Sequence, residues 1–165
     1  MRARRGAVDK DTSLKLRDVD GCTPLIRAAR MPRAVTGIRR LVRAGADIDA
    51  MSSSGETALM VASSSGRLAN VKVLLDLGAD ATIVNREGES ALTYAIVWQQ
   101  RRVVRLLLAS GVSPNRPRRP WSPLMYAAFE GDLEICKMLV KSGAHRRPRT
   151  PAAGTQPTSP RRRGT

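Results

Sequence analysis

The sequence predicts an all-α solenoid in which helix–turn–helix units stack side by side, and two repeated patterns carry this prediction. The first is a short phrase that occurs four times, as GCTPL from Gly21, GETAL from Gly55, GESAL from Gly88 and WSPL from Trp121. The second is a glycine near the end of each unit, at Gly45, Gly78, Gly111 and Gly143. The first three of these glycines are 33 residues apart, a period that indicates a repeat array.

Each phrase predicts the start of a first helix. A Thr or Ser hydroxyl caps free backbone N–H groups, and proline suits the first helical position. These cap residues are Thr23, Thr57, Ser90 and Ser122. Small residues in the middle of each first helix keep it thin, so that the next unit can approach closely: Ala28-Ala29, Ala62-Ser63, Ala95-Ile96 and Ala127-Ala128.

A second helix follows in each unit, with apolar residues at helical spacing. The clearest stripes run from Leu68 to Leu75, from Val103 to Leu108 and from Leu133 to Leu139. The terminal glycine permits the left-handed conformation that ends this helix. Polar turns precede the phrases, and we call them fingers: residues 18–21, 52–55, 85–88 and 116–120.

A period of 33 residues built on T-P-L-x-x-A-A and on G-A-D resembles the ankyrin repeat. The G-A-D pattern appears at Gly45-Ala46-Asp47 and Gly78-Ala79-Asp80, and nearly so at Gly143-Ala144-His145. The resemblance covers residues 17–145 and implies repeats at about 17–50, 51–84, 85–115 and 116–145, with hairpin-like fingers. The family's T-P-L-H histidine is absent, replaced by Ile26, Met60, Thr93 and Met125, so we expect a looser stack than in an ideal array.

Two basic segments flank the predicted repeats. Residues 1–16 form an N-terminal arm with a net charge of +3, and residues 146–165 carry six arginines and no acid. The second segment also holds four prolines and no large apolar residue, so we expect a disordered tail. The whole chain has a formal net charge of +15.

The composition argues against an enzyme or a metal centre. The chain has one histidine, His145, with no carboxylate or cysteine beside it, and no phosphate-cradling glycine loop or G-x-S-x-G turn. We expect no cofactor, and no apolar run is long enough for membrane insertion.

Cys22 and Cys136 fall in the first and fourth repeats, too far apart for a disulfide. Free thiols predict an intracellular protein, cytoplasmic or nuclear. Cys136 falls on an apolar stripe, whereas Cys22 occupies a finger position that is usually exposed.

The resemblance implies a partner protein on the concave face formed by the fingers and first helices. All five aromatic residues lie between positions 94 and 129, and clustered exposed aromatics are typical of binding hot spots. The candidate binding residues are the aromatics with nearby acidic and apolar positions: Trp98, Trp121, Phe129, Tyr126, Tyr94, Glu56, Glu87, Glu89, Glu130 and Met31.

Alternatives remain for these aromatics. Tyr94 and Tyr126 are equally consistent with packing against a neighbouring repeat, and Phe129 with closing the end of the array. A narrower interpretation is a cage for methylated lysine, in which Trp121 and Tyr126 resemble cage residues of some ankyrin arrays.

The sequence therefore predicts a non-catalytic protein-interaction module: an adaptor, scaffold or inhibitor. The alternative function is a nuclear factor that binds nucleic acid or chromatin through its tail arginines: Arg146, Arg147, Arg149, Arg161, Arg162 and Arg163. The last repeat keeps an apolar stripe at Ile135, Met138 and Leu139 with nothing apolar after it. We therefore expect modest stability, or self-association through an uncapped end.

Overall fold

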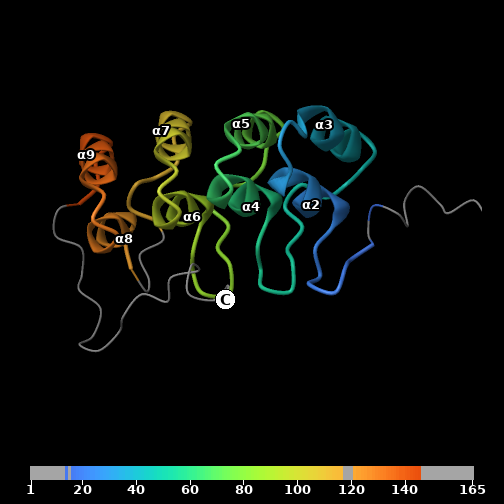
Figure 1. The fold of residues 1–165 in the computed structure, drawn as a ribbon, viewed down its shortest axis with the longest axis horizontal. Helices are drawn as coiled ribbons and strands as arrows, with labels where there is room; N and C mark the ends of the chain where they lie inside the picture. The colour runs from blue at the N-terminus through green and yellow to red at the C-terminus, as the bar shows by residue number, and fades with distance from the viewer. Residues whose placement is uncertain (1–13, 15, 117–120, 146–165) are drawn as a thin grey trace, which may run out of the picture.

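The computed structural model describes residue 14 and residues 16–116 and 121–145, and Figure 1 shows the helices in two rows. The inner row is α2 (Pro24–Arg30), α4 (Ala58–Ser64), α6 (Ala91–Val97) and α8 (Pro123–Phe129). The outer row is α3 (Val35–Arg43), α5 (Leu68–Asp76), α7 (Arg101–Ala109) and α9 (Leu133–Lys141). The predicted all-α solenoid is confirmed, because these eight helices of the described residues form consecutive inner–outer pairs.

Every inner helix begins with the side-chain cap that the sequence predicts. The hydroxyl of each cap residue accepts a hydrogen bond from the backbone N–H three residues later, at 3.3 to 3.4 Å. The four pairs are Thr23 with Ile26, Thr57 with Met60, Ser90 with Thr93, and Ser122 with Met125. The repeated phrase is therefore a repeated helix start.

Stacking of neighbouring units supplies the core. Each inner helix packs on the next inner helix, and each outer helix packs on the next outer helix. Ala29, Ala62, Ala95 and Ala127 are fully buried in the inner row, where small side chains permit close approach. Larger buried side chains such as Leu74 and Leu107 fill the space between the rows. Each unit thus buries its apolar face only with its neighbours.

Polar side chains also join neighbouring units. Asn70 is buried at the start of α5, and its Nδ2 donates to the backbone oxygens of Ala29 at 3.0 Å and of Met31 at 2.8 Å. One unit later, Gln100 Nε2 donates to the backbone oxygen of Ser64 at 3.3 Å. These bonds satisfy carbonyl groups at the ends of the preceding inner helices, which have no partner within the helix.

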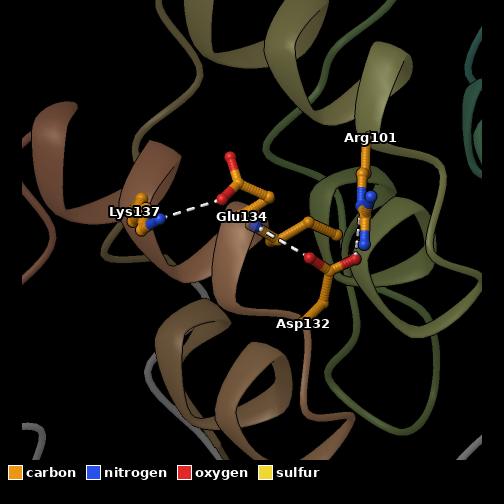
Figure 2. A network of polar contacts seen from close by, with 5 residues as sticks. Arg101, Asp132, Glu134 and Lys137 are labelled. Carbon is orange, nitrogen blue, oxygen red and sulfur yellow. Dashed lines mark hydrogen bonds and ion pairs between the residues drawn. The ribbon is translucent and has the colours of Figure 1, made fainter.

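An ion pair joins the third and fourth units, as Figure 2 shows. Asp132 is 4% exposed, and its Oδ1 caps α9 by accepting from the backbone N–H of Ile135 at 3.1 Å. Its Oδ2 accepts from Arg101 Nε of α7 at 2.8 Å. Burial acts to raise the pKa of Asp132, but the hydrogen bonds from Arg101 and from the backbone outweigh it and lower the pKa.

The first three fingers share one turn design. Asp18, Ser52 and Asn85 each accept, through a side-chain oxygen, the backbone N–H four residues later, at 2.8 to 3.1 Å. Neighbouring fingers are joined by a bond from the Ser53 N–H to the Asp20 oxygen at 3.0 Å. Gly21 has φ +70°, and a Cβ there would lie 2.8 Å from the Ser53 nitrogen. Only glycine suits this turn, because it tolerates positive φ and leaves room for the next finger.

Two expectations about buried residues are wrong. Ile135 and Leu139 do not form an exposed stripe at the end of the array: both are fully buried, because they face the preceding unit, while Met138 is partly buried. Cys22 is also buried rather than exposed, because the following finger packs beside it, and burial raises the pKa of its thiol. Apart from residues 14 and 16, the predicted arm lies outside the described residues, as does the predicted tail.

Candidate partner-binding face

The candidate face consists of the fingers together with the inner helices, and its most regular feature is a row of C-cap positions. Met31, Ser65, Trp98 and Glu130 directly follow α2, α4, α6 and α8, so they occupy equivalent positions in the four units. Met31 is 60% exposed, whereas Trp98 is partly buried and packs against the core. We call the surface formed by this row and the fingers the finger face.

Three of the predicted aromatics form one cluster in the fourth unit. The ring of Trp121 lies 5.7 Å from that of Phe129 in an edge-to-face arrangement, and 5.9 Å from that of Tyr126 with a tilted geometry. Phe129 is 46% exposed and Trp121 is partly buried. The edge-to-face arrangement of Trp121 and Phe129 is one that stabilises aromatic pairs.

Tyr94 is not an exposed binding residue. It is 5% exposed, and its hydroxyl donates to Glu56 Oε1 at 2.8 Å and accepts from Asn85 Nδ2 at 3.0 Å. Burial raises the pKa of Tyr94, and the charge of Glu56 raises it further. The alternative in which this tyrosine packs against the neighbouring repeat therefore describes it correctly.

Tyr126 and Glu89 are buried as well. For Tyr126 this agrees with the alternative in which it packs against a neighbouring repeat, whereas for Glu89 it corrects the expected exposure. Tyr126 is 1% exposed and Glu89 is 2% exposed. Glu89 Oε2 accepts from Asn85 Nδ2 at 3.1 Å. Burial raises the pKa of Tyr126, and the charge of Glu89 contributes to the same shift. The residue after a finger glycine is therefore enclosed here, because a tyrosine of the next unit covers it.

The remaining acidic candidates stay accessible in part. Glu56, Glu87 and Glu130 are each partly buried. Glu56 has a second partner in Ser54, whose hydroxyl donates to Oε2 at 2.9 Å. Glu56 therefore joins its own finger to the following unit through Tyr94. The backbone N–H of Glu87 donates to Asn85 Oδ1 at 3.0 Å, and this bond holds the backbone of Glu87 in the finger turn.

Opposite charges occupy different parts of the fold. The segments from an outer helix to the next inner helix, residues 44–57 and 77–90, hold six acidic side chains and one arginine. The outer helices α3 and α7 hold six arginines and no acid. The segments that connect α3 to α4 and α5 to α6 are therefore acidic, whereas the outer helices α3 and α7 are basic.

Sequence reasoning missed two polar groupings that position this face: the network of Glu56, Asn85 and Tyr94, and the pair of Arg101 and Asp132. Asp132 directly before an apolar helix carries a cap signal. Its arginine partner lies 31 residues away, however, and no local pattern marks that pairing.

The described part of the chain offers no cluster of metal ligands. In residues 16–116 and 121–145, no group of three or more His, Cys, Asp or Glu is placed to hold a metal ion. A pocket of about 350 Å³ lies between Gly66 and the start of α7, and Gln99, Gln100 and Arg102 line it. These side chains supply no nucleophile or general base. None of the described helices is long and apolar enough to cross a membrane.

Comparison with known protein families gives a match to most of the chain. A family model described as "Ankyrin repeats (3 copies)" matches residues 6–85, 25–118 and 77–150 in three overlapping hits. The matched regions include all eight helices of the described residues. The tail arginines Arg146, Arg147 and Arg149 lie within the last hit but outside the described residues, and Arg161, Arg162 and Arg163 lie outside both.

Proposed function

The chain belongs to the ankyrin-repeat family, and we propose that it binds a partner protein through the finger face, without catalysis, as an adaptor, scaffold or inhibitor. One observation carries the proposal: large apolar side chains at the ends of three inner helices are exposed or partly exposed. Met31 is 60% exposed and Phe129 is 46% exposed, with Trp98 partly buried between them along the row of units. Aromatic anchors surrounded by charged residues are typical of protein interfaces.

The charge of the segments that connect α3 to α4 and α5 to α6 favours a basic partner. Acidic side chains outnumber basic ones six to one in residues 44–57 and 77–90. Complementary charge accelerates association and selects partners more than it raises affinity. We therefore expect a partner segment that presents apolar side chains to the Trp98–Phe129 region and Lys or Arg to the acidic side chains of these connecting segments.

Affinity purification from native lysate with three forms of the full chain tests the proposal. The first form is unchanged, the second carries Trp98→Ala and Phe129→Ala, and the third carries Arg102→Ala and Arg105→Ala on the exposed side of α7. We expect a partner that is retained by the first and third forms and lost by the second. With the purified partner, Phe129→Ala is expected to cost more than about 2 kcal/mol of binding free energy, the hot-spot threshold.

Thermal unfolding of the same variants separates binding from folding. Phe129→Ala removes a half-exposed ring and its edge-to-face contact with Trp121, so it is expected to lower the midpoint only slightly. Trp98 and Trp121 pack partly against the core, so their Ala variants are expected to lose both affinity and stability. A partner that is retained by the second form but lost by the third would place binding on the outer helices and refute the proposal.

A second candidate function, binding of nucleic acid or chromatin, has separate support. The fifth residue of every outer helix is basic: Arg39, Lys72, Arg105 and Lys137. A line of cations across adjacent helices, together with the arginine-rich tail, suits a phosphate backbone. Binding of nucleic acid by this line of cations must weaken steeply as the salt concentration rises. The double variant Lys72→Glu with Arg105→Glu must make binding less dependent on salt. Fluorescence anisotropy with a labelled duplex measures both, and affinity that is insensitive to salt would rule this candidate out.

A further inference from the structure

The last inner helix exposes positions that are buried in every other unit. Leu25, Leu59 and Leu92 are at most 1% exposed, whereas the equivalent Leu124 is only partly buried. The same holds for Met125, whose equivalents Ile26, Met60 and Thr93 are at most 1% exposed. Ala128 is exposed, although its equivalents Ala29, Ser63 and Ile96 are fully buried.

The last outer helix shows the same change. Ile38, Val71 and Val104 are fully buried, but the equivalent Cys136 is only partly buried. A position that is buried in the first three units and open only in the fourth must be one that the following unit covers. Phe129 at 46% and Leu133 at 65% exposure extend this apolar surface. We call it the end face: Leu124, Met125, Ala128, Phe129, Leu133 and Cys136.

The opposite end of the array has polar residues at the corresponding uncovered positions. Arg27 is exposed where later inner helices carry the buried Val61, Tyr94 and Tyr126. Arg40 is exposed where later outer helices carry Val73, Leu106 and Met138. These arginines make the first unit a polar cap, as the end of a repeat array requires. An apolar end face has no complementary surface there, so head-to-tail stacking of chains is unfavourable.

The composition of residues 146–165 offers no large apolar side chain to cover the end face either. Residues 146–165 contain no Val, Leu, Ile, Met, Phe, Tyr or Trp, and six of them are arginine. No charged side chain belongs to the end face itself. Its border carries both signs, with Glu134 paired to Lys137 at 3.0 Å. Two copies of this surface can therefore meet without opposing like charges at the centre.

We propose that the end face is a self-association surface on which a second copy of this chain docks, fourth unit against fourth unit. Contact between identical patches is isologous, and such an interface closes at two chains. This inference goes beyond the proposed function, because it concerns the end of the array and leaves Met31, Trp98 and the acidic connecting segments of both chains open. Phe129 belongs to both surfaces, so a partner protein that uses this ring competes with the second copy.

Sedimentation velocity of the full chain over a concentration series tests the inference. Leu133→Glu and Ala128→Glu each place a charge on the end face, at side chains that are exposed in the single chain. Val19→Glu is the matched control, because Val19 is fully exposed and lies in the first finger. We expect the unchanged chain and the control to dimerise with the same concentration dependence, and both end-face variants to associate at least tenfold more weakly. Circular dichroism verifies that each variant keeps its helical content.

Three results would overturn the inference. One is an unchanged chain that stays monomeric at every concentration. Another is a dimer that both end-face variants leave intact, since the contact would then lie elsewhere. The third is growth beyond two chains, which would indicate a head-to-tail contact instead of an isologous one. If one end-face variant loses its helical content, the other still decides between these outcomes.

Discussion

Tyr94 shows how a single hydroxyl group joins two repeats. It donates to Glu56 of the preceding unit at 2.8 Å and accepts from Asn85 of its own finger at 3.0 Å. Burial and the charge of Glu56 raise its pKa, so the hydroxyl keeps its proton and its donor role. The bond with Asn85 is buried and the bond with Glu56 is partly buried, so leaving the hydroxyl without a partner there is costly.

Replacing Tyr94 by Phe is expected to lower the free energy of unfolding by about 1–3 kcal/mol, because a buried polar network loses its shared partner. Urea unfolding followed by circular dichroism measures the loss. A double-mutant cycle with Glu56→Ala isolates the bond between the two side chains. A coupling energy near zero would show that this hydrogen bond contributes nothing to stability.

The sequence predicts local contacts between residues well and contacts across repeats poorly. The cap at Thr57 depends on a hydroxyl and an N–H three residues later, so the pattern contains both partners. The burial of Glu89 depends on Tyr126, which approaches from another unit and leaves no mark near Glu89 in the sequence. Cys22 is buried for a similar reason, with the following finger beside its own.

At the scale of the elements, Asp132 joins the start of α9 to α7. Its carboxylate accepts hydrogen bonds from the backbone N–H of Ile135, which caps α9, and from Arg101 Nε. Both contacts use the charged carboxylate. Since hydrogen bonds lower its pKa in the folded chain, this carboxylate stabilises the fold at any pH above its unfolded value. That stabilisation is lost as the pH falls from the ordinary value of 3.8 through the lower folded value.

Asp132→Ala is therefore expected to cost about 1–2 kcal/mol of stability at neutral pH through loss of the cap. Asp132→Asn keeps a capping oxygen and should cost less. Thermal midpoints of the three proteins should converge as the pH falls below 4, since the wild-type carboxylate then becomes protonated. A difference that stays constant from neutral pH down to strong acid would contradict the ionised role of Asp132.

The helices themselves were the easiest elements to predict. A hydroxyl cap, a small-residue helix, an apolar stripe and a terminal glycine recur in each unit, so every copy supports the others. The burial of the apolar stripe in α9 is harder to predict. Ile135 and Leu139 are apolar, but periodicity alone does not say whether the preceding unit or open solvent lies beside them.

At the scale of the whole molecule, the array is linear and each unit contacts only its neighbours. The second and third units are covered on both sides, whereas the first and fourth units are each covered on one side. Stability in such an array is a sum of unit and interface contributions. The two end units therefore hold fewer of the interfaces that oppose local opening.

Native-state hydrogen exchange should reveal this gradient. We expect the slowest exchange in α4 and α6, whose residues are almost all buried, and faster exchange in α3, where Ile38 is the one fully buried side chain. Opening at an array end breaks one interface, whereas opening in the middle breaks two, so protection should fall toward α3. Mass spectrometry of peptic fragments at low protein concentration resolves the helices separately and keeps self-association from adding protection at α8 and α9. Equal protection in all eight helices would mean that the described units unfold as one cooperative block, and that the interfaces are strong enough to suppress fraying at the ends.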